Sequence, residues 1–433
     1  MQKHIYFDED AAPPVASTSA PAGTQFARCC STARVDYDFG DPCYVFKVVR
    51  SHDGSRLAAT LSNNTIKTYS IHGEGLSHAG DVLAHNKTIT DASFPLEDAP
   101  YALYSSSADG SVRAWDSRSA QQAESFQATK ELLCFDVCDN VVAAGAAGGD
   151  VLFWDRRTRK ALAAFDDMHM DDVTQVRFHA ASRRLLTASQ DGLVAVHELG
   201  GGLDQDDGFV AALNAGTSVE EIGLYGPGQE RLWVRTGTES VQLWEWAKAA
   251  APEAAGGDVA FLDLTWEARG GLAAAAARGA GGAGGAAAAA AAFEEVDYLC
   301  GCYWDAASGR LFVVAGTNSG AVGFFPIDEA AALSGALPSP AAALGPPPVA
   351  LRGAHGAVVR SVCCLAPAAA DGAAAPLCAT GGEDSKLALW TLAPAAGGVG
   401  GGGAAPGASD ASTGSGSSGP ARHRQGGRRA APY

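Results

Sequence analysis

Histidine, hydroxyl and aspartate residues recur in this sequence at spacings that could support acid–base or nucleophilic chemistry. His85 is followed by Ser105 and Asp109, and Trp115 lies a few residues further on. A hydroxyl, an imidazole and a carboxylate are the three groups of a hydrolase triad, in which the histidine takes a proton from the hydroxyl. Hydrolysis is therefore the first activity to consider for these residues.

The same residue types recur elsewhere, which favours a structural role. The further sets are His169, Thr187 and Asp191, with His197 where a Trp is expected, and His355, Thr380, Asp384 and Trp390. A catalytic triad is built once, from residues distant in sequence, whereas a set that repeats belongs to a repeated structural unit. We interpret each set as a buried hydrogen-bond chain within one unit and predict no catalytic residue.

The unit that carries these sets is a small-residue strand, a tight polar turn and an alternating strand that ends near an aromatic ring. The clearest copies are LYSSSADGSVRAWD (103–116), AAGGDVLFWD (146–155) and ATGGEDSKLALWT (379–391), and weaker copies cover 57–70, 185–198, 232–245 and 312–325. The equivalent ring positions are Tyr69, Trp115, Trp154, His197, Trp244, Phe325 and Trp390. The first five follow one another at about 40–45 residues, the period of four-stranded blades. We predict an all-β, seven-bladed β-propeller.

The predicted propeller spans residues 25–393. Low-complexity segments near 268–292, 329–349 and 366–376 lengthen the last two repeats, and we expect them to be loops without a packed core of their own. Residues 1–24 and the Gly/Ala/Ser-rich tail 394–433 are expected to be disordered. Residues 25–35 resemble one further strand, and pairing it with the last blade would close the ring.

Composition limits the function classes. The chain has 31 Lys and Arg against 48 Asp and Glu, a net charge of −17, which argues against a body that binds nucleic acid. The ten cysteines include no C-x-x-C pair, so we expect buried thiols, no metal and no cofactor. The N-terminus lacks the apolar core of a secretory signal and no apolar run is long enough to span a membrane, so we expect a protein of the cytoplasm, the nucleus or both.

Three segments carry a family resemblance. They are HMDDVTQVRFHAASRRLLTASQDGLVAV (169–196), VDYLCGCYWDAASGRLFVVAGTNSGAV (296–322) and GAHGAVVRSVCCL with TGGEDSKLALW (353–365 and 380–390). The chain resembles the WD repeat-containing protein 89 family over most of residues 25–393. The resemblance implies a single WD-repeat propeller that acts as an intracellular adaptor, without enzymatic residues and linked to growth and ribosome production. The Ala/Gly insertions and the long tail depart from the family pattern.

Three features vary between the repeats and could bind partners. WDSR (115–118) and WDRR (154–157) fit W-D-x-R, which is similar to the docking signature of substrate receptors for cullin-RING ubiquitin ligases, so Arg118 and Arg157 are candidates. The alternative is an ordinary basic turn after W-D, which is common in propellers and in most cases docks nothing. The acidic loop 165–172 is expected near the central opening, where it could receive a basic peptide or remain a solvated loop. Its carboxylates are Asp166, Asp167, Asp171 and Asp172.

The tail is the third feature. Its end, RHRQGGRRAAPY, carries Arg422, Arg424, Arg428 and Arg429. A basic end on an acidic body could direct the chain to the nucleus or touch RNA, or could simply be solvated. Taken together, the sequence predicts a non-catalytic, monomeric protein-interaction scaffold in nuclear or ribosome-assembly complexes. The alternative is a ligase substrate receptor that docks through its W-D-x-R segments.

Overall fold

The computed structural model describes residues 25–391 except 37–41, 97, 200–202, 204, 251–259, 265–295, 335–336, 338 and 366–375. The predicted N-terminal segment 1–24, the insertion 268–292, nearly all of the insertion 366–376 and the tail 394–433 lie outside the described residues. The regular secondary structure of the described part is almost all β-strand. It forms a β-propeller, as the repeat period predicts.

Five sheets have four antiparallel strands each, in sequence order. The first contains β2 (Val45–Arg50), β3 (Arg56–Leu61), β4 (Ile66–His72) and β5 (Gly75–Val82). The second contains β6 (Ile89–Ser93), β7 (Ala102–Ser107), β8 (Ser111–Asp116) and β9 (Gln121–Gln127). The third contains β10 (Leu132–Cys138), β11 (Val141–Ala146), β12 (Val151–Asp155) and β13 (Lys160–Phe165). The fourth contains β14 (Val173–His179), β15 (Arg184–Ser189), β16 (Leu193–Glu198) and β17 (Phe209–Asn214). The fifth contains β18 (Val219–Tyr225), β19 (Arg231–Thr236), β20 (Val241–Trp244) and β21 (Ala260–Leu264).

The remaining strands form one eight-stranded sheet. Its order is β22 (Tyr298–Asp305), β23 (Arg310–Gly316), β24 (Val322–Pro326), β25 (Val349–Leu351), β1 (Gln25–Arg34), β28 (Lys386–Thr391), β27 (Pro376–Gly382) and β26 (Val359–Cys364). The N-terminal strand β1 joins its two halves. Residues 25–27 pair in parallel with β25, and residues 28–34 pair antiparallel with β28.

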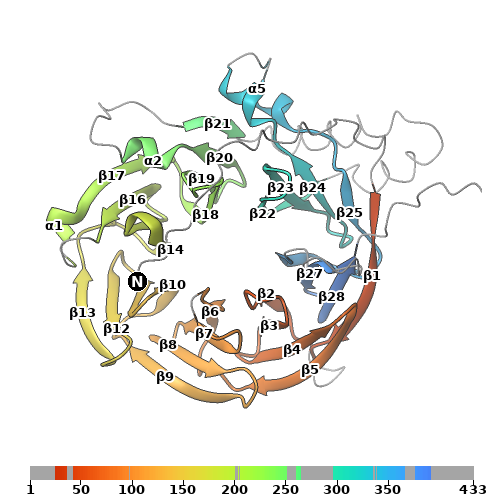
Figure 1. Cartoon of the computed structure of the whole chain (residues 1–433), viewed down its shortest axis with the longest axis horizontal. Helices are drawn as coiled ribbons and strands as arrows, with labels where there is room; N and C mark the ends of the chain where they lie inside the picture. Colours follow the sequence, from red (N-terminus) through yellow and green to blue (C-terminus); the bar gives the residue numbers. More distant parts are fainter. Residues whose placement is uncertain are drawn as a thin grey trace, which may run out of the picture. The chain divides into compact units, whose positions relative to one another are not determined.

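The sheets follow one another around a centre (Figure 1). The first strand of each four-strand series contacts the first strand of the next, in the order β2, β6, β10, β14, β18, β22, β26 and back to β2. Short helices lie in the connections: η1 (Ala180–Ser182), α1 (Gln205–Gly208), α2 (Trp246–Ala249), α5 (Glu329–Leu333) and η2 (Pro340–Ala343). No helix in the described part is long and apolar enough to cross a membrane.

Equivalent positions in the sheets carry equivalent features. Each repeated segment found in the sequence forms, wholly or in part, the hairpin of a second and a third strand. The ring residue always lies on the third strand, where, for example, Trp115 pairs with Leu103 and Trp390 pairs with Cys378. Each first strand also carries a β-bulge near its start. Because a bulge redirects the residue it adds, this irregularity determines which side chains face the centre.

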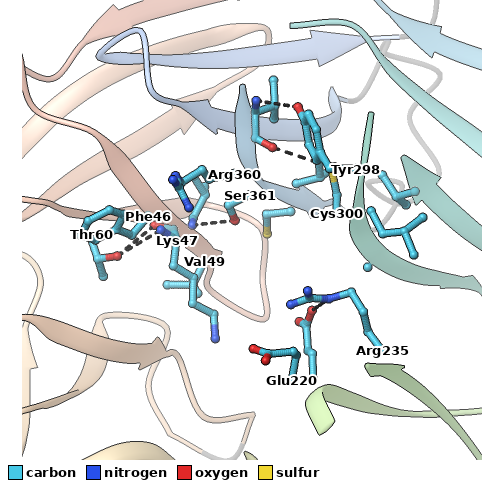
Figure 2. Close-up of a pocket in the computed structure, with 18 of the residues that line it drawn as sticks. Phe46, Lys47, Val49, Thr60, Glu220, Arg235, Tyr298, Cys300, Arg360 and Ser361 are labelled. Atoms are coloured by element: carbon cyan, nitrogen blue, oxygen red, sulfur yellow. Dashed lines mark hydrogen bonds and ion pairs between the residues drawn. The ribbon is translucent and has the colours of Figure 1, made fainter. Parts of the chain in front are cut away.

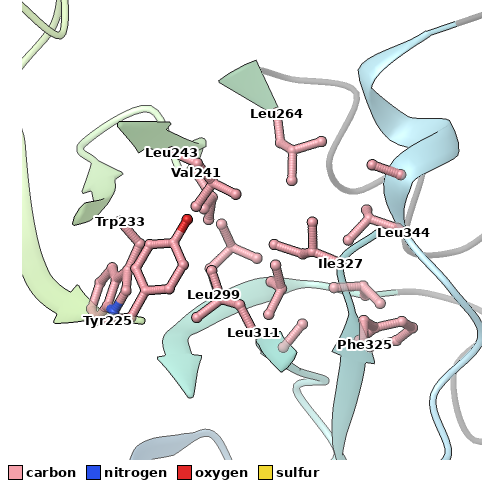
Figure 3. Packing of buried hydrophobic residues seen from close by; sticks show 14 of the residues in the cluster. Tyr225, Trp233, Val241, Leu243, Leu264, Leu299, Leu311, Phe325, Ile327 and Leu344 are labelled. Atoms are coloured by element: carbon pink, nitrogen blue, oxygen red, sulfur yellow. The ribbon is translucent and has the colours of Figure 1, made fainter. Parts of the chain in front are cut away.

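Apolar side chains fill the space between neighbouring sheets. One cluster joins Tyr225 and Trp233 of the fifth sheet to Leu311 and Phe325 of the next series (Figure 3). Burying one such large side chain contributes about 1.5–3 kcal/mol. Similar clusters lie between other neighbouring sheets. The core is therefore a series of interfaces between sheets, each holding two of them together.

The insertion 329–349 is more ordered than the sequence suggests. It contains α5, whose first turn is capped by Asp328, with Oδ1 accepting a 3.0 Å hydrogen bond from Ala331 N. Glu329 accepts a 2.6 Å hydrogen bond from Arg231 Nη1, and Leu344 is buried in the cluster of Figure 3. An alanine-rich segment gives little sequence signal for packing, but here it completes the core beside the fifth sheet.

Candidate functional site

The first histidine set is a continuous hydrogen-bond chain within the second sheet. Trp115 Nε1 donates to Ser105 Oγ at 2.9 Å, and His85 Nε2 lies 2.8 Å from the same oxygen. His85 Nδ1 lies 3.0 Å from Asp109 Oδ2. Since Ser105 Oγ already accepts from the tryptophan, its own proton can go to Nε2, and the Nδ1 proton can then go to the aspartate.

The pKa values agree with a neutral histidine in this chain. Burial lowers the pKa of His85, although the hydrogen bond to Asp109 acts in the opposite direction. Burial alone would raise the pKa of Asp109, but hydrogen bonds from Ser111 and His85 outweigh it, and the pKa is lowered. A neutral imidazole beside a carboxylate has one proton to donate, which is what the chain requires.

The other two sets form in the same way. His355 Nε2 lies 2.8 Å from Thr380 Oγ1, which accepts a 2.7 Å bond from Trp390 Nε1, and His355 Nδ1 lies 3.0 Å from Asp384. The third set comprises His169, with 2.9 Å to Thr187 and 3.1 Å to Asp191. The side chains of all three histidines are fully buried, so no substrate reaches them. The sets position strands, and none is an active site.

The fourth sheet lacks the tryptophan of its set. His197 takes its place, and its Nδ1 is buried without a hydrogen-bond partner among the described residues. Its ring packs against Phe165 and Phe209, with centroids 5.5 Å from each. Burial lowers its pKa to about 4. An imidazole that occupies an apolar contact must remain uncharged, so this residue packs as an aromatic ring.

The two W-D-x-R arginines differ in how firmly other residues of the chain already hold their side chains. Arg118 follows β8 and is held by Asp116, with Nη2 2.6 Å from Oδ2, and by stacking on the Tyr101 ring at 3.5 Å. Arg157 follows β12, has a side chain 74% exposed and approaches Asp155 only to 3.8 Å. Arg157 can therefore meet a partner without first leaving another contact, whereas Arg118 cannot.

The neighbouring arginine, Arg156, was not among the predicted site residues. Arg156 Nη2 donates to Asp98 at 2.8 Å and to the Tyr104 hydroxyl at 2.6 Å, which ties the third sheet to the second. Its backbone follows the same W-D motif, so the motif alone cannot separate the residue that faces inward from the one that faces outward. The sequence offers one signal: Arg156 lies two residues after Trp154, and alternate residues of a strand face the same side.

The acidic loop is anchored by its ends and presents its middle outward. Asp172 Oδ1 accepts from Gly148 N at 2.9 Å, and Gly149, at a φ of 98°, lies so close that a Cβ there would come within 2.2 Å of His169 O. Asp166, Asp167 and Asp171 are exposed, and Asp172 is half-buried. None of the four carboxylates lines the central cavity described below. Through Asp172 the loop contacts the turn between β11 and β12 of the neighbouring sheet, and its place near the central opening stays a prediction.

A central cavity of about 1200 Å³ is enclosed mainly by first strands (Figure 2). It is lined by residues of β2, β6, β14, β18, β22 and β26, with single residues of β3, β19 and β23 and residues of neighbouring turns. The sequence pattern does not predict this cavity. Residue types recur on the second and third strands, whereas the first strands share a bulge but no residue type.

The cavity wall is polar and asymmetric. Three of its basic groups are in ion pairs: Lys47 with Asp91, Arg235 Nε with Glu221 Oε2 at 3.3 Å, and Arg360 Nε with Glu383 Oε1 at 2.8 Å. The fourth, Arg50, donates from Nε to the carbonyl oxygen of Cys364 at 2.8 Å. The wall carries further carboxylates, at Glu220 and Glu239 of the fifth sheet and at Asp297, which precedes β22 and accepts a 2.6 Å hydrogen bond from Asn318 N.

Thiols also line this wall, at Cys300 and Cys302. Burial raises the pKa of Cys300 to about 12 and raises that of Cys302 as well, so neither is a thiolate nucleophile at neutral pH. Among the described residues no group of three or more His, Cys, Asp or Glu is arranged to hold a metal ion. The chemistry that this wall supports is recognition through charge and hydrogen bonding.

The fold and the buried sets define a WD-repeat β-propeller. The WD domain, G-beta repeat family model matches residues 80–116 and 163–198. The chain is similar to WD repeat-containing protein GTS1 of Arabidopsis thaliana, with 32% identity over 365 residues that cover 82% of this chain and 83% of that protein. It belongs to this family of WD repeat-containing proteins.

Two further relatives match shorter segments. WD repeat-containing protein 89 homolog of Dictyostelium discoideum is 31% identical over 212 residues, which cover 49% of this chain and 57% of that protein. Periodic tryptophan protein 2 homolog of Caenorhabditis elegans is 35% identical over 91 residues, or 20% of this chain and 10% of that protein. WD-repeat propellers are typically non-enzymatic platforms for protein interaction, and none of these relatives is named as an enzyme.

Proposed function

We propose that this chain is a non-catalytic scaffold that assembles proteins in nuclear or ribosome-assembly complexes. The observation that supports the proposal is that each histidine set forms its hydrogen bonds within a single sheet. The residues that could do chemistry are committed to holding strands, whereas exposed loops such as 165–172 and the cavity wall are available for contacts. A closed ring holds such loops in fixed relation, so partners can be bound by several loops at once.

We also propose that the ring has seven blades. In this interpretation the eight-stranded sheet is two blades, one of β22–β25 and one of β26–β28 completed by β1. The cycle of contacts between first strands supports this count, since β22 and β26 each occupy one place in it. The bulge near the start of both strands supports it too, because it matches the bulge in every other first strand.

The nuclear and ribosomal part of the proposal rests on the family resemblance, and we expect the chain in the cytoplasm, the nucleus or both. Affinity purification of the tagged full-length chain from cells, followed by mass spectrometry, tests it. Enrichment of pre-ribosomal proteins over a tagged control propeller is expected. Recovery of no nuclear or pre-ribosomal protein above the control would contradict this assignment.

A ligase receptor is the second candidate, and one observation favours it. The Arg157 side chain is exposed and only loosely paired, as a docking residue should be. The test is a pull-down of cullin-ligase adaptors with wild type, Arg157→Ala and Arg118→Ala. Loss of adaptor with Arg157→Ala and retention with Arg118→Ala is expected for docking through the exposed arginine. Unchanged recovery with a chain that carries both Arg118→Ala and Arg157→Ala excludes this function.

A further inference from the structure

The outermost strand of a sheet has a free backbone edge unless another part of the chain covers it. The edge of β25 is covered by β1, whose residues 25–27 pair with it in parallel. β1 also lies against β5, where Ser31 Oγ accepts a 3.3 Å hydrogen bond from Leu76 N. α2 contacts β17, and α5 and η2 contact β21. Most outer strands therefore have a neighbour, and the neighbour of β25 is an added strand.

The outer strands β9 and β13 have no comparable neighbour in the described part of the chain. β9 is protected by charged groups: Glu124 lies on the strand, and Arg159 Nη2 donates to the Ala123 carbonyl oxygen at 3.5 Å. Charged side chains on an edge are how natural sheets avoid pairing with other chains. β13 has no such protection after Lys160, because residues 161–165 are all apolar.

β13 lies on the outer rim of the ring (Figure 1). Lys160, Ala161, Leu162 and Ala164 are exposed, and Leu162, at 50% exposure, is the bulged residue of the strand. Among the described residues, no element other than β12 forms a hydrogen bond with the backbone of residues 160–165. The edge therefore presents N–H and C=O groups that a further strand could pair with.

The two ends of β13 carry opposite charge. At its start, Arg157 is 74% exposed and approaches Asp155 only to 3.8 Å, and Lys160 has no ion pair within the described part. At its end, Asp166 and Asp167 are exposed and have no ion pair with a described residue. A strand of this length spans about 20 Å, well beyond the Debye length of about 8 Å at 0.15 M salt. Each end therefore attracts its own counter-charge.

We propose that β13 accepts an extended segment of a partner protein as a fifth, antiparallel strand of the third sheet. The segment is basic at its N-terminal end, rich in β-branched residues in the middle and acidic at its C-terminal end. Antiparallel pairing places its acidic end beside Lys160 and its basic end beside Asp166 and Asp167. Main-chain hydrogen bonds supply affinity, and the charged ends fix the direction. This site deepens the proposed scaffold function and rests on it.

The chemistry of the edge selects against other partners. A helix has already used its backbone groups within itself, so it leaves the edge of β13 unpaired. The phosphates of RNA would meet like charge at Asp166 and Asp167. A second copy of this chain carries the same two charged ends, and its β13 would also pair in antiparallel fashion, so the oligomeric state belongs to the test.

The test is fluorescence anisotropy with the full-length chain at about 0.15 M salt, where general attraction to an acidic protein is reduced. The probe is a short labelled peptide that begins with lysines, continues with alternating valine and threonine, and ends with glutamates. One control peptide has the lysines and glutamates exchanged. Another carries N-methyl groups on the valines and threonines, so that its middle cannot donate backbone hydrogen bonds.

Two protein variants have matched controls. Leu162→Asp places a charge on the edge, and Ala123→Asp makes the same change at the equivalent bulged residue of β9. Lys160→Glu reverses the charge at the start of β13. Arg310→Glu makes an equal charge change at the exposed first residue of β23.

We expect Leu162→Asp and Lys160→Glu each to weaken binding about tenfold and the two control variants to leave it within about twofold, an effect too small for a lost direct contact. Both control peptides should bind about tenfold more weakly than the probe. Equal binding by either control peptide would overturn the proposal, as would equal weakening by Leu162→Asp and Ala123→Asp or unchanged binding by Leu162→Asp. Thermal unfolding establishes that each variant is folded, and the peptide controls need no change in the protein.

The remaining outcomes separate the edge from a second copy and from the scaffold function. Sedimentation equilibrium of the wild-type chain should give a monomer, and a dimer that Leu162→Asp dissociates would assign the edge to a second copy and overturn the proposal. If the peptide does not bind but affinity purification recovers partner proteins, the edge site is wrong and the scaffold function stands. If the peptide binds through Leu162 but no partner is recovered from cells, the edge site stands and the assembly role is wrong.

Discussion

Trp390 and His197 occupy equivalent places on the third strands β28 and β16, yet only Trp390 completes its set. Trp390 Nε1 donates to Thr380 Oγ1 at 2.7 Å, whereas His197 Nδ1 has no partner among the described residues. The hydroxyl of Thr380 therefore serves two buried neighbours, Trp390 and His355, whereas that of Thr187 serves His169 and the weakly accepting sulfur of Met168, without a ring donor. The two threonines provide a matched pair for measuring what one extra hydrogen bond contributes.

We expect Thr380→Val to lower the free energy of unfolding by about 2–4 kcal/mol, because it leaves the Trp390 donor and the His355 ring nitrogen unsatisfied. Thr187→Val should cost about 1 kcal/mol less, since besides His169 it leaves only the Met168 sulfur, a weak acceptor, without its partner. The measurement is the urea midpoint of purified protein, followed by tryptophan fluorescence. Equal costs for the two substitutions would show that the tryptophan hydrogen bond adds nothing.

The pH dependence of stability should contain a contribution from His197. Burial lowers its pKa to about 4, while the unfolded chain titrates near 6.5. Between these values the unfolded state takes up a proton that the folded state does not, so stability falls as the pH drops from about 6.5 to about 4, by on the order of 3 kcal/mol. Burial also lowers the pKa of His85 and His169, which act in the same direction.

His197→Phe isolates this contribution. The variant keeps a ring between Phe165 and Phe209 and loses the titrating group, so its urea midpoint should change less than that of wild type between pH 7 and pH 5. His72, which is exposed, is the control, and His72→Gln should retain the wild-type slope. An unchanged slope in His197→Phe would place the titration elsewhere.

The basic end of the tail predicts a localisation effect. Arg422, Arg424, Arg428 and Arg429 form the only concentrated basic run at this end of the sequence. If they direct the chain to the nucleus, removing residues 420–433 from a fluorescently tagged protein should reduce the nuclear signal. A variant with these four arginines changed to lysine is the control for charge, and it should keep the wild-type distribution. A truncated chain that is distributed like wild type argues for a simply solvated tail.

The second and third strands were predictable because they repeat. His355, Thr380 and Trp390 recur as types at a fixed period, so their structural role can be read before any fold is known. The cavity residues Glu220 and Glu221 could not be found in this way, since the first strands share a bulge and not a residue, and a bulge depends on the pairing with the second strand. The burial of Leu344 was likewise unpredictable, because the alanines around it give no periodic pattern.

The N-terminal strand offers the sharpest test of how the ring is held together. β1 pairs with β25 through residues 25–27 and with β28 through residues 28–34, and Arg28 also reaches Glu74 of the first sheet at 2.6 Å. Removing it exposes the edges of β25 and β28 at once, and unpaired edges associate with other chains. We expect a chain lacking residues 1–34 to unfold at a lower urea concentration and to aggregate in size-exclusion chromatography. A chain lacking only residues 1–24 keeps β1 and should match the full-length protein. If both truncations are equally stable and monomeric, β1 does not hold the ring closed.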